Sequence, residues 1–124
     1  MPFWRRSEPR GLRRGEELLV EVPCRIVDST GTSLPDAGTA VVVGVSDERI
    51  LVWDVARVPT QAGKLLGVVG RSRLLGAEIE RAGARTRVRF GFEEQACLFV
   101  EAPRERHPEQ LAWVLSAEQG RVGQ

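Results

Sequence analysis

Few residues of this chain have the types and spacing that catalysis requires. The single histidine, His107, precedes a predicted helix, and no serine in the sequence has a plausible base near it. The carboxylate pairs Asp47-Glu48 and Glu93-Glu94 lie in predicted turns, where solvent leaves such groups without the tuning that acid–base catalysis needs. We therefore expect a protein that is not an enzyme and has no catalytic residues.

Metal and phosphate chemistry also lack a sequence signature. Cys24, Cys97 and His107 show no paired spacing of the kind that builds a zinc site. Residues 67–70, GVVG, lack the lysine and following helix of a phosphate-binding loop. Both cysteines lie in apolar, strand-like segments, where a reduced thiol behaves as a small hydrophobic side chain. We expect no metal, no cofactor and a cytoplasmic location.

The first 15 residues form a basic segment that we interpret as a mobile arm. It combines an aromatic pair with five arginines, so it could contact an anionic membrane. The alternative is that Trp4 packs on the domain while the arginines stay in water. The candidate membrane-contact residues are Phe3, Trp4, Arg5, Arg6, Arg10, Arg13 and Arg14.

A second group of arginines lies at every other position of a predicted strand. Arg85, Arg87 and Arg89 could meet the phosphates of a nucleic acid, but the preceding strand carries Glu78 and Glu80 on its outward face. A turn at residues 82–83 would place Glu80 opposite Arg85 and Glu78 opposite Arg87, and such pairs neutralise the row. We therefore expect a structural role for these arginines and no nucleic-acid partner.

These groups depend on a scaffold of predicted β-strands. Residues 38–55 predict a central hairpin, with apolar, β-branched segments on both sides of a Ser46–Arg49 turn. In the strand at residues 74–80, Leu75, Ala77 and Ile79 are expected to face the core. Pro23 lacks an amide proton, so its strand should bend or be unpaired on one side there. The seven predicted strands span residues 17–27, 40–45, 50–55, 65–69, 74–80, 85–92 and 96–101.

A single helix is predicted after the strands, from Pro108 to about Gln119, with Gly120 as its end. Trp113 lies opposite its apolar stripe, which makes this side chain the candidate contact for a partner. The alternative is that Trp113 covers the loop at residues 57–63 and seals the rim of the sheet. The predicted core residues of the sheet and helix are Val42, Val52, Val88, Phe90, Leu98, Leu111, Val114 and Leu115.

Length and composition favour one soluble domain. The chain has 124 residues, a mass of 13.7 kDa and a formal net charge of +1, which suits a single domain without a strong overall field. Its start lacks the apolar segment of a secretory signal. We expect a domain over residues 16–119 and a tail over residues 120–124. The predicted fold is mainly β: a seven-stranded antiparallel, partly open barrel capped by one C-terminal α-helix.

This pattern resembles the pleckstrin-homology-like superfamily, in particular its small bacterial and GRAM-like branch. The segment VSDERILVW at residues 45–53 is similar to the family's LTDRRLLVW type of hairpin, and HPEQLAWVL at residues 107–115 matches its terminal helix. The resemblance implies a non-catalytic binding module for a protein or peptide partner. The family's phosphoinositide site is not carried over, because residues 28–38 contain no lysine or arginine. Peripheral membrane association remains the alternative, and a hollow barrel that carries a small ligand is disfavoured by bulky inward residues.

Overall fold

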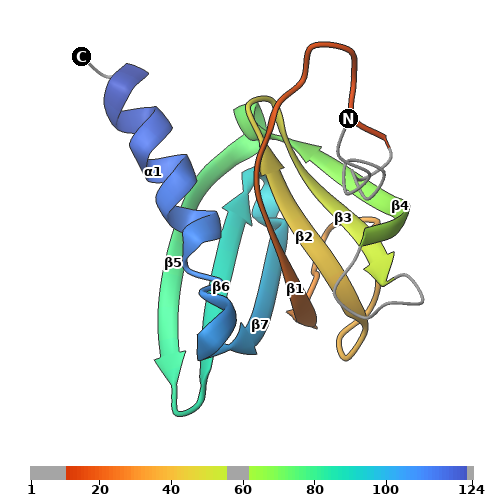
Figure 1. Ribbon diagram of the computed structural model, residues 1–124, viewed down its shortest axis with the longest axis vertical. Coiled ribbons are helices and arrows are strands. Elements are labelled where there is room, and N and C mark those ends of the chain that lie inside the picture. The colour runs from red at the N-terminus through yellow and green to blue at the C-terminus, as the bar shows by residue number, and fades with distance from the viewer. Residues whose placement is uncertain (1–10, 56–61, 123–124) are drawn as a thin grey trace, which may run out of the picture.

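The computed structural model describes residues 11–55 and 62–122. Within these ranges the chain forms seven β-strands, three short 3-10 turns and one α-helix (Figure 1). The strands are β1 Leu18–Asp28, β2 Ala40–Ser46, β3 Arg49–Val55, β4 Ala62–Gly70, β5 Leu74–Ala82, β6 Arg85–Phe92 and β7 Cys97–Pro103. The 3-10 turns are η2 Arg71–Arg73, η3 Glu93–Gln95 and η4 Arg104–Arg106, and the helix is α1 Gln110–Val122.

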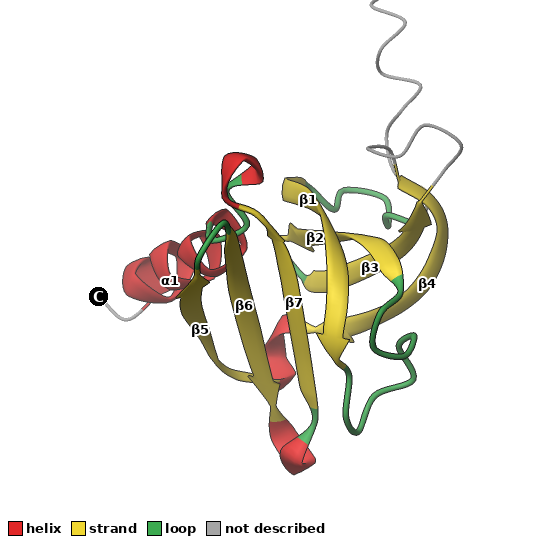
Figure 2. Cartoon of the chain, turned by 90° about the horizontal axis from the view of Figure 1, so that it is seen from below, coloured by secondary structure: helices red, strands yellow, loops and turns green. Residues whose placement is uncertain are grey.

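All seven strands belong to one antiparallel sheet in the order β4-β3-β2-β1-β7-β6-β5. The edges β4 and β5 are consecutive in the chain but do not pair with each other, so the sheet is not closed. The helix α1 lies at the β5 end of the sheet (Figures 1 and 2) and contacts β1, β2 and β5. The predicted fold class, a mainly β, open antiparallel sheet with one C-terminal helix, is confirmed.

The strand β1 joins the two halves of the sheet through a short region of pairing. It pairs with β2 from Leu18 to Arg25, but with β7 only from Arg25 to Asp28. Pro23 lies before the β7 pairing begins, which agrees with the predicted loss of pairing on one side. As a result, β1 and β7 diverge from Arg25 toward the start of β1. We call this divergence the β1–β7 fork.

The main core fills the space between the inner face of the sheet and α1. The period-two alternation of β6 and β7 places alternate side chains in this core, as predicted. Among the predicted core residues, Val52, Val88, Phe90, Leu98, Leu111 and Leu115 are buried in the main core, and Val114 is partly buried against it.

A second, smaller cluster lies on the other face of the sheet. Val42 is buried as predicted, but it packs with Leu51 and Trp53 in this cluster rather than in the main core. The reason is that the neighbouring valines of β2 take the inner positions, while the segment before β1 contributes Leu12 to the outer cluster. Gly44 makes room for the indole, because a Cβ there would come within 2.7 Å of the Trp53 ring.

A buried ion pair attaches the segment before β1 to the central hairpin. Arg49 Nη2 donates to Glu16 Oε1 at 2.6 Å, and Arg49 Nε donates to Glu16 Oε2 at 3.0 Å. Arg49 Nη2 also donates to the carbonyl oxygen of Gly11 at 2.7 Å, and the Ser46 hydroxyl donates to Glu16. The Glu16 side chain is fully buried and that of Arg49 nearly so. This network holds residues 11–16 against β3.

The structure corrects two details of β5. The turn to β6 consists of Gly83 and Ala84, with Gly83 at a φ of 65°, so Glu80 lies opposite Arg87 and not opposite the predicted Arg85. Glu78 in turn lies opposite Arg89. The register therefore differs by two residues, because the turn is centred one residue later than predicted.

The predicted core positions of β5 are also wrong in part. Leu75 is 72% exposed and Ile79 is 36% exposed, although Ile79 lies opposite the buried Val88 and so shares its face of the sheet. The physical reason is that β5 is an edge strand, and its side chains have a neighbouring strand on one side only. A register irregularity between Leu74 and Gly76 further separates Leu75 from the core.

The helix differs from prediction at both ends. It begins at Gln110, after a turn at Pro108 and Glu109, and continues to Val122, so Gly120 lies inside it. Glycine costs about 1 kcal/mol in a helix relative to alanine, which a helix can tolerate.

Candidate functional site

The open edge of the sheet at β5 is the feature best suited to binding. No backbone hydrogen bond joins the outer edge of β5 to another described segment, because β5 pairs only with β6. Leu75 and Ile79 leave apolar surface on this strand, and Trp113 of the neighbouring α1 is 53% exposed. We call Leu75, Ile79, Trp113 and the free edge of β5 the β5–α1 surface.

The packing of α1 explains why Trp113 faces solvent. Leu111, Ala112 and Leu115 are buried, and Val114 is partly buried against the main core. These residues occupy the side of the helix that docks on the sheet, so the indole of Trp113 is left outside, where the helical pattern predicts it. The alternative, in which Trp113 covers the loop at residues 57–63, involves residues 57–61 outside the described part of the chain.

The other edge of the sheet, β4, offers less apolar surface. Val68 is 41% exposed and is the one large apolar side chain of β4 among the exposed residues. The β4 edge has two register irregularities with β3, at Trp53 and Val55, against one in β5 between Leu74 and Gly76, and irregular edges are poor templates for an added strand. The β5 edge is therefore the better candidate for strand addition.

The predicted arginine row is paired, but with more partners than the sequence indicated. Arg87 Nη1 lies 3.3 Å from Glu80 Oε1, and Arg87 Nε lies 3.2 Å from Glu101 Oε1. Arg85 Nη1 lies 3.8 Å from Glu101 Oε2. The guanidinium of Arg89 lies 4.1 Å from the ring centroid of Phe99, a cation–π contact. Sequence reasoning missed the contributions of β7, since period-two patterns do not show which strands are neighbours.

A charge-reversal cycle tests this pairing. We expect Arg87→Glu to lower the free energy of unfolding by about 0.5–1 kcal/mol, because it places three carboxylates together on an exposed face. Reversing the partner with Glu80→Arg should restore part of the loss. Urea denaturation of the single and double variants measures the coupling, and Glu78→Arg is the control. Equal rescue by Glu78→Arg would show that the register is the one predicted from the sequence.

Most of the predicted membrane-contact residues lie outside the described ranges: Phe3, Trp4, Arg5, Arg6 and Arg10. Arg13 is described, and its Nη1 lies 3.1 Å from Glu48 Oε1. Arg14 is exposed. No helix in the described part of the chain is long and apolar enough to cross a membrane. Membrane contact by the N-terminal segment stays a prediction.

His107, Glu109 and Cys24 are titratable groups held in local contacts. His107 Nδ1 lies 3.2 Å from Glu109 Oε2. Burial opposes ionisation of Glu109, but hydrogen bonds from its own backbone amide and from His107 outweigh it and hold the pKa below the ordinary value. Burial raises the pKa of the Cys24 thiol to about 12, so this thiol is unreactive. Within residues 11–55 and 62–122, no group of three or more His, Cys, Asp or Glu could hold a metal ion.

Two concave sites were not foreseen from the sequence. A pocket of about 130 Å³ lies between the β1–β2 loop, β4 and the end of β6. A larger pocket of about 300 Å³ lies at the β1–β7 fork and brings together Arg25, Arg85 and Arg106. These arginines come from three separate segments of the chain, so no local sequence motif predicts that they line one pocket.

No protein-family model, curated protein or solved structure matches this chain. The resemblance to pleckstrin-homology-like domains therefore stays a prediction, and the function must be inferred from the residues and contacts described above.

Proposed function

We propose that this protein is a non-catalytic binding module of the cytoplasm that captures an extended, apolar segment of a partner protein at the β5–α1 surface. The observation that carries the proposal is that the β5 edge, which pairs with no other described strand, lies on an element with exposed Leu75 and Ile79 and beside the helix of the exposed Trp113. The resemblance to pleckstrin-homology-like domains also supports the proposal of a binding module, as do the strand order and the C-terminal helix. Two cysteines without a disulfide fit a reducing compartment.

Binding would occur by addition of the partner segment as a further strand. The amide and carbonyl groups along the free edge of β5 supply main-chain hydrogen bonds, which give affinity without sequence preference. Side-chain preference comes from the surface beside that edge. Ile79 shares the inner face with the buried Val88, so an apolar side chain of the partner at this level would extend the main core toward α1. Large aromatic side chains such as Trp113 are frequent anchors of binding sites.

The charges of β5 bias the choice of partner. Glu78 and Glu80 lie on the outward face, opposite Arg89 and Arg87, so that face is largely neutralised. The inner face offers apolar groups to a partner. Successive side chains of a strand point to opposite sides. A partner segment that alternates apolar and polar residues would therefore place its apolar side chains on the inner face and its polar side chains on the outward face.

The proposal is tested with peptides selected from a random twelve-residue library on the purified protein. We expect peptides with alternating apolar residues, whose binding protects β5 amide protons from hydrogen exchange. Ile79→Lys and Trp113→Ala should each weaken binding at least about tenfold, because each removes an exposed apolar side chain of the surface. Val68→Lys on β4 is the matched control and should leave the affinity unchanged.

Tryptophan fluorescence gives an independent readout. In a Trp4→Phe variant the remaining tryptophans are the buried Trp53 and the exposed Trp113, so a blue shift on peptide addition reports shielding of Trp113. Selected peptides that bind equally well to Ile79→Lys and Trp113→Ala, or that protect β4 amides instead, would overturn the assignment to the β5–α1 surface.

A further inference from the structure

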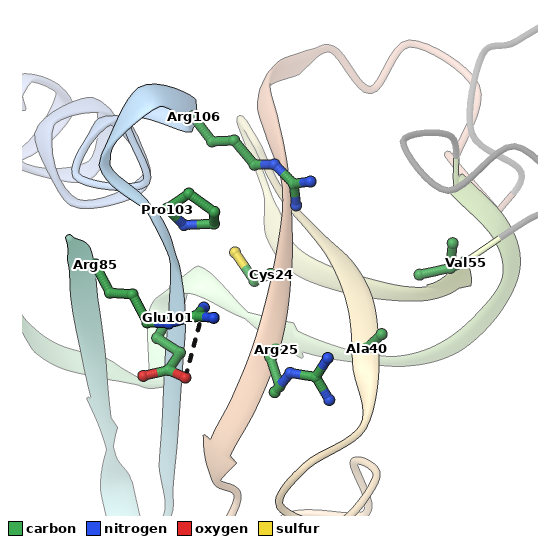
Figure 3. Close-up of a pocket in the computed structure, with 8 residues that line it drawn as sticks. All are labelled: Cys24, Arg25, Ala40, Val55, Arg85, Glu101, Pro103 and Arg106. Atoms are coloured by element: carbon green, nitrogen blue, oxygen red, sulfur yellow. Dashed lines mark ion pairs between the residues drawn. The ribbon is translucent and has the colours of Figure 1, made fainter.

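The pocket at the β1–β7 fork is a second site, distinct from the β5–α1 surface. It has a volume of about 300 Å³ and opens where β1 separates from β7 (Figure 3). Its apolar wall consists of Cys24, Ala40, Val55 and Pro103, and its polar groups are Arg25, Arg85, Arg106 and Glu101. Figure 3 shows the three arginines placed around the gap on β1, β6 and η4.

The charges of this pocket do not balance. Among the described residues that line the pocket, Glu101 is the one carboxylate. That carboxylate is shared between Arg85 at 3.8 Å and Arg87, which is not among those lining residues, at 3.2 Å. In the described part of the chain, Arg25 and Arg106 have no carboxylate within ion-pair distance. The described lining residues therefore carry a net of two positive charges.

Backbone carbonyls hold the two unbalanced arginines in place. Arg25 Nη1 donates to the carbonyl oxygen of Gly38 at 2.7 Å, and Arg106 Nη1 donates to the carbonyl oxygen of Pro23 at 3.3 Å. A guanidinium has five N–H donors in a fixed planar fork, so each of these bonds orients the group and leaves further donors for a ligand. The fold thus keeps two cations near one pocket without neutralising them.

We propose that this pocket binds the phosphate group of a small phosphomonoester. Arginine forks match the oxygens of a phosphate group and form charge-assisted hydrogen bonds with them. A phosphomonoester dianion would balance the two excess positive charges. The apolar wall formed by Ala40, Val55 and Pro103 would contact the organic part of the ligand.

The site is built for binding and not for phosphate transfer. Among the described lining residues the only nucleophile is the thiol of Cys24, which is buried and donates to the carbonyl oxygen of Val22 at 3.4 Å. Burial raises the pKa of this thiol to about 12, so the thiolate needed for attack is absent at neutral pH.

Titration calorimetry at pH 7.5 and low ionic strength tests the proposal with phenyl phosphate, which is largely dianionic at this pH, and with inorganic phosphate. We expect saturable binding that Arg25→Gln and Arg106→Gln each weaken at least about tenfold, the loss expected for a hydrogen bond to a charged group. Arg104→Gln is the matched control, because Arg104 belongs to the same 3-10 turn as Arg106 but does not line the pocket. Thermal melts without ligand show whether each variant is folded.

Further probes separate the possible sources of the phosphate group. Succinate, a dianion without phosphate geometry, should bind at least about tenfold more weakly than phenyl phosphate. Vesicles that contain phosphatidic acid present the same group on a lipid, and Arg106-dependent binding to them alone would assign the site to a lipid headgroup. Phosphate and vesicle binding that are unchanged in both Arg25→Gln and Arg106→Gln, or equal affinity for succinate, would overturn the proposal.

Discussion

Replacing Phe90 with alanine is expected to lower the free energy of unfolding by about 3–5 kcal/mol, the loss typical of a large core side chain. Phe90 lies in the middle of β6, is fully buried and stacks on Phe92 with 6.5 Å between ring centroids. Truncation removes these contacts and leaves a cavity that strands hydrogen-bonded on both sides cannot easily fill. Guanidinium denaturation of the purified variant measures the change.

The adjacent residue provides the control for this substitution. Arg89 lies on the opposite, exposed face of the same strand, so Arg89→Ala should cost less than about 1.5 kcal/mol, mainly through the lost contact with Phe99. An unchanged denaturation midpoint in Phe90→Ala, with a large loss in Arg89→Ala, would mean that the two faces of β6 are reversed.

The second large effect is expected at the buried ion pair. Arg49→Met should destabilise the protein by about 3–5 kcal/mol, because it leaves the fully buried carboxylate of Glu16 without its partner. The double variant Glu16→Leu/Arg49→Met should recover much of the loss, since two apolar side chains replace both charges. Arg13→Met breaks the exposed pair with Glu48 and should change the stability by less than about 1 kcal/mol. A double variant no more stable than Arg49→Met would contradict this account.

The same ion pair sets an acid limit on stability. The hydrogen bonds from Arg49 lower the pKa of Glu16 from 4.5 to about 2, against the opposing effect of burial. Because the pKa is lower in the folded state, ionised Glu16 stabilises the fold fully above about pH 4.5. This contribution is lost as the pH falls from about 4.5 toward about 2. Denaturation midpoints measured across this range should fall less steeply in Glu16→Leu/Arg49→Met than in the original protein.

The strand faces could be predicted because alternation is a local property. In β1 and β6 apolar residues occupy every second position, and the structure buries Val22, Cys24 and Ile26 of β1 and the alternate residues of β6. The exposure of Leu75 and Ile79 could not be predicted in the same way. Their pattern is that of a half-buried strand, but β5 is an edge strand, and edge position is decided by the order of the whole sheet.

The candidate sites follow the same rule: a position set by local periodicity could be predicted, and a site formed by distant segments could not. Helical periodicity sufficed to place Trp113 on the outer side of α1. The pocket at the β1–β7 fork was missed, because Arg25 and Arg106 become neighbours only through the pairing of β1 with β7 and the turn that follows it. The Glu16–Arg49 pair was missed for a similar reason, since its partners lie on segments that no shared motif connects.

The limited pairing of β1 with β7 also has a consequence for how the chain folds. Strands β1–β4 and β5–β7 each form a meander of sequence-adjacent hairpins, which can close quickly because each pairs strands that are consecutive in the chain. The pairing of Ile26 with Val100 instead closes a loop that contains most of the chain. The chain loses conformational entropy when this loop closes, before the contacts between β1 and β7 can compensate for the loss. Joining the two meanders at β1 and β7 is therefore the step that should limit the folding rate.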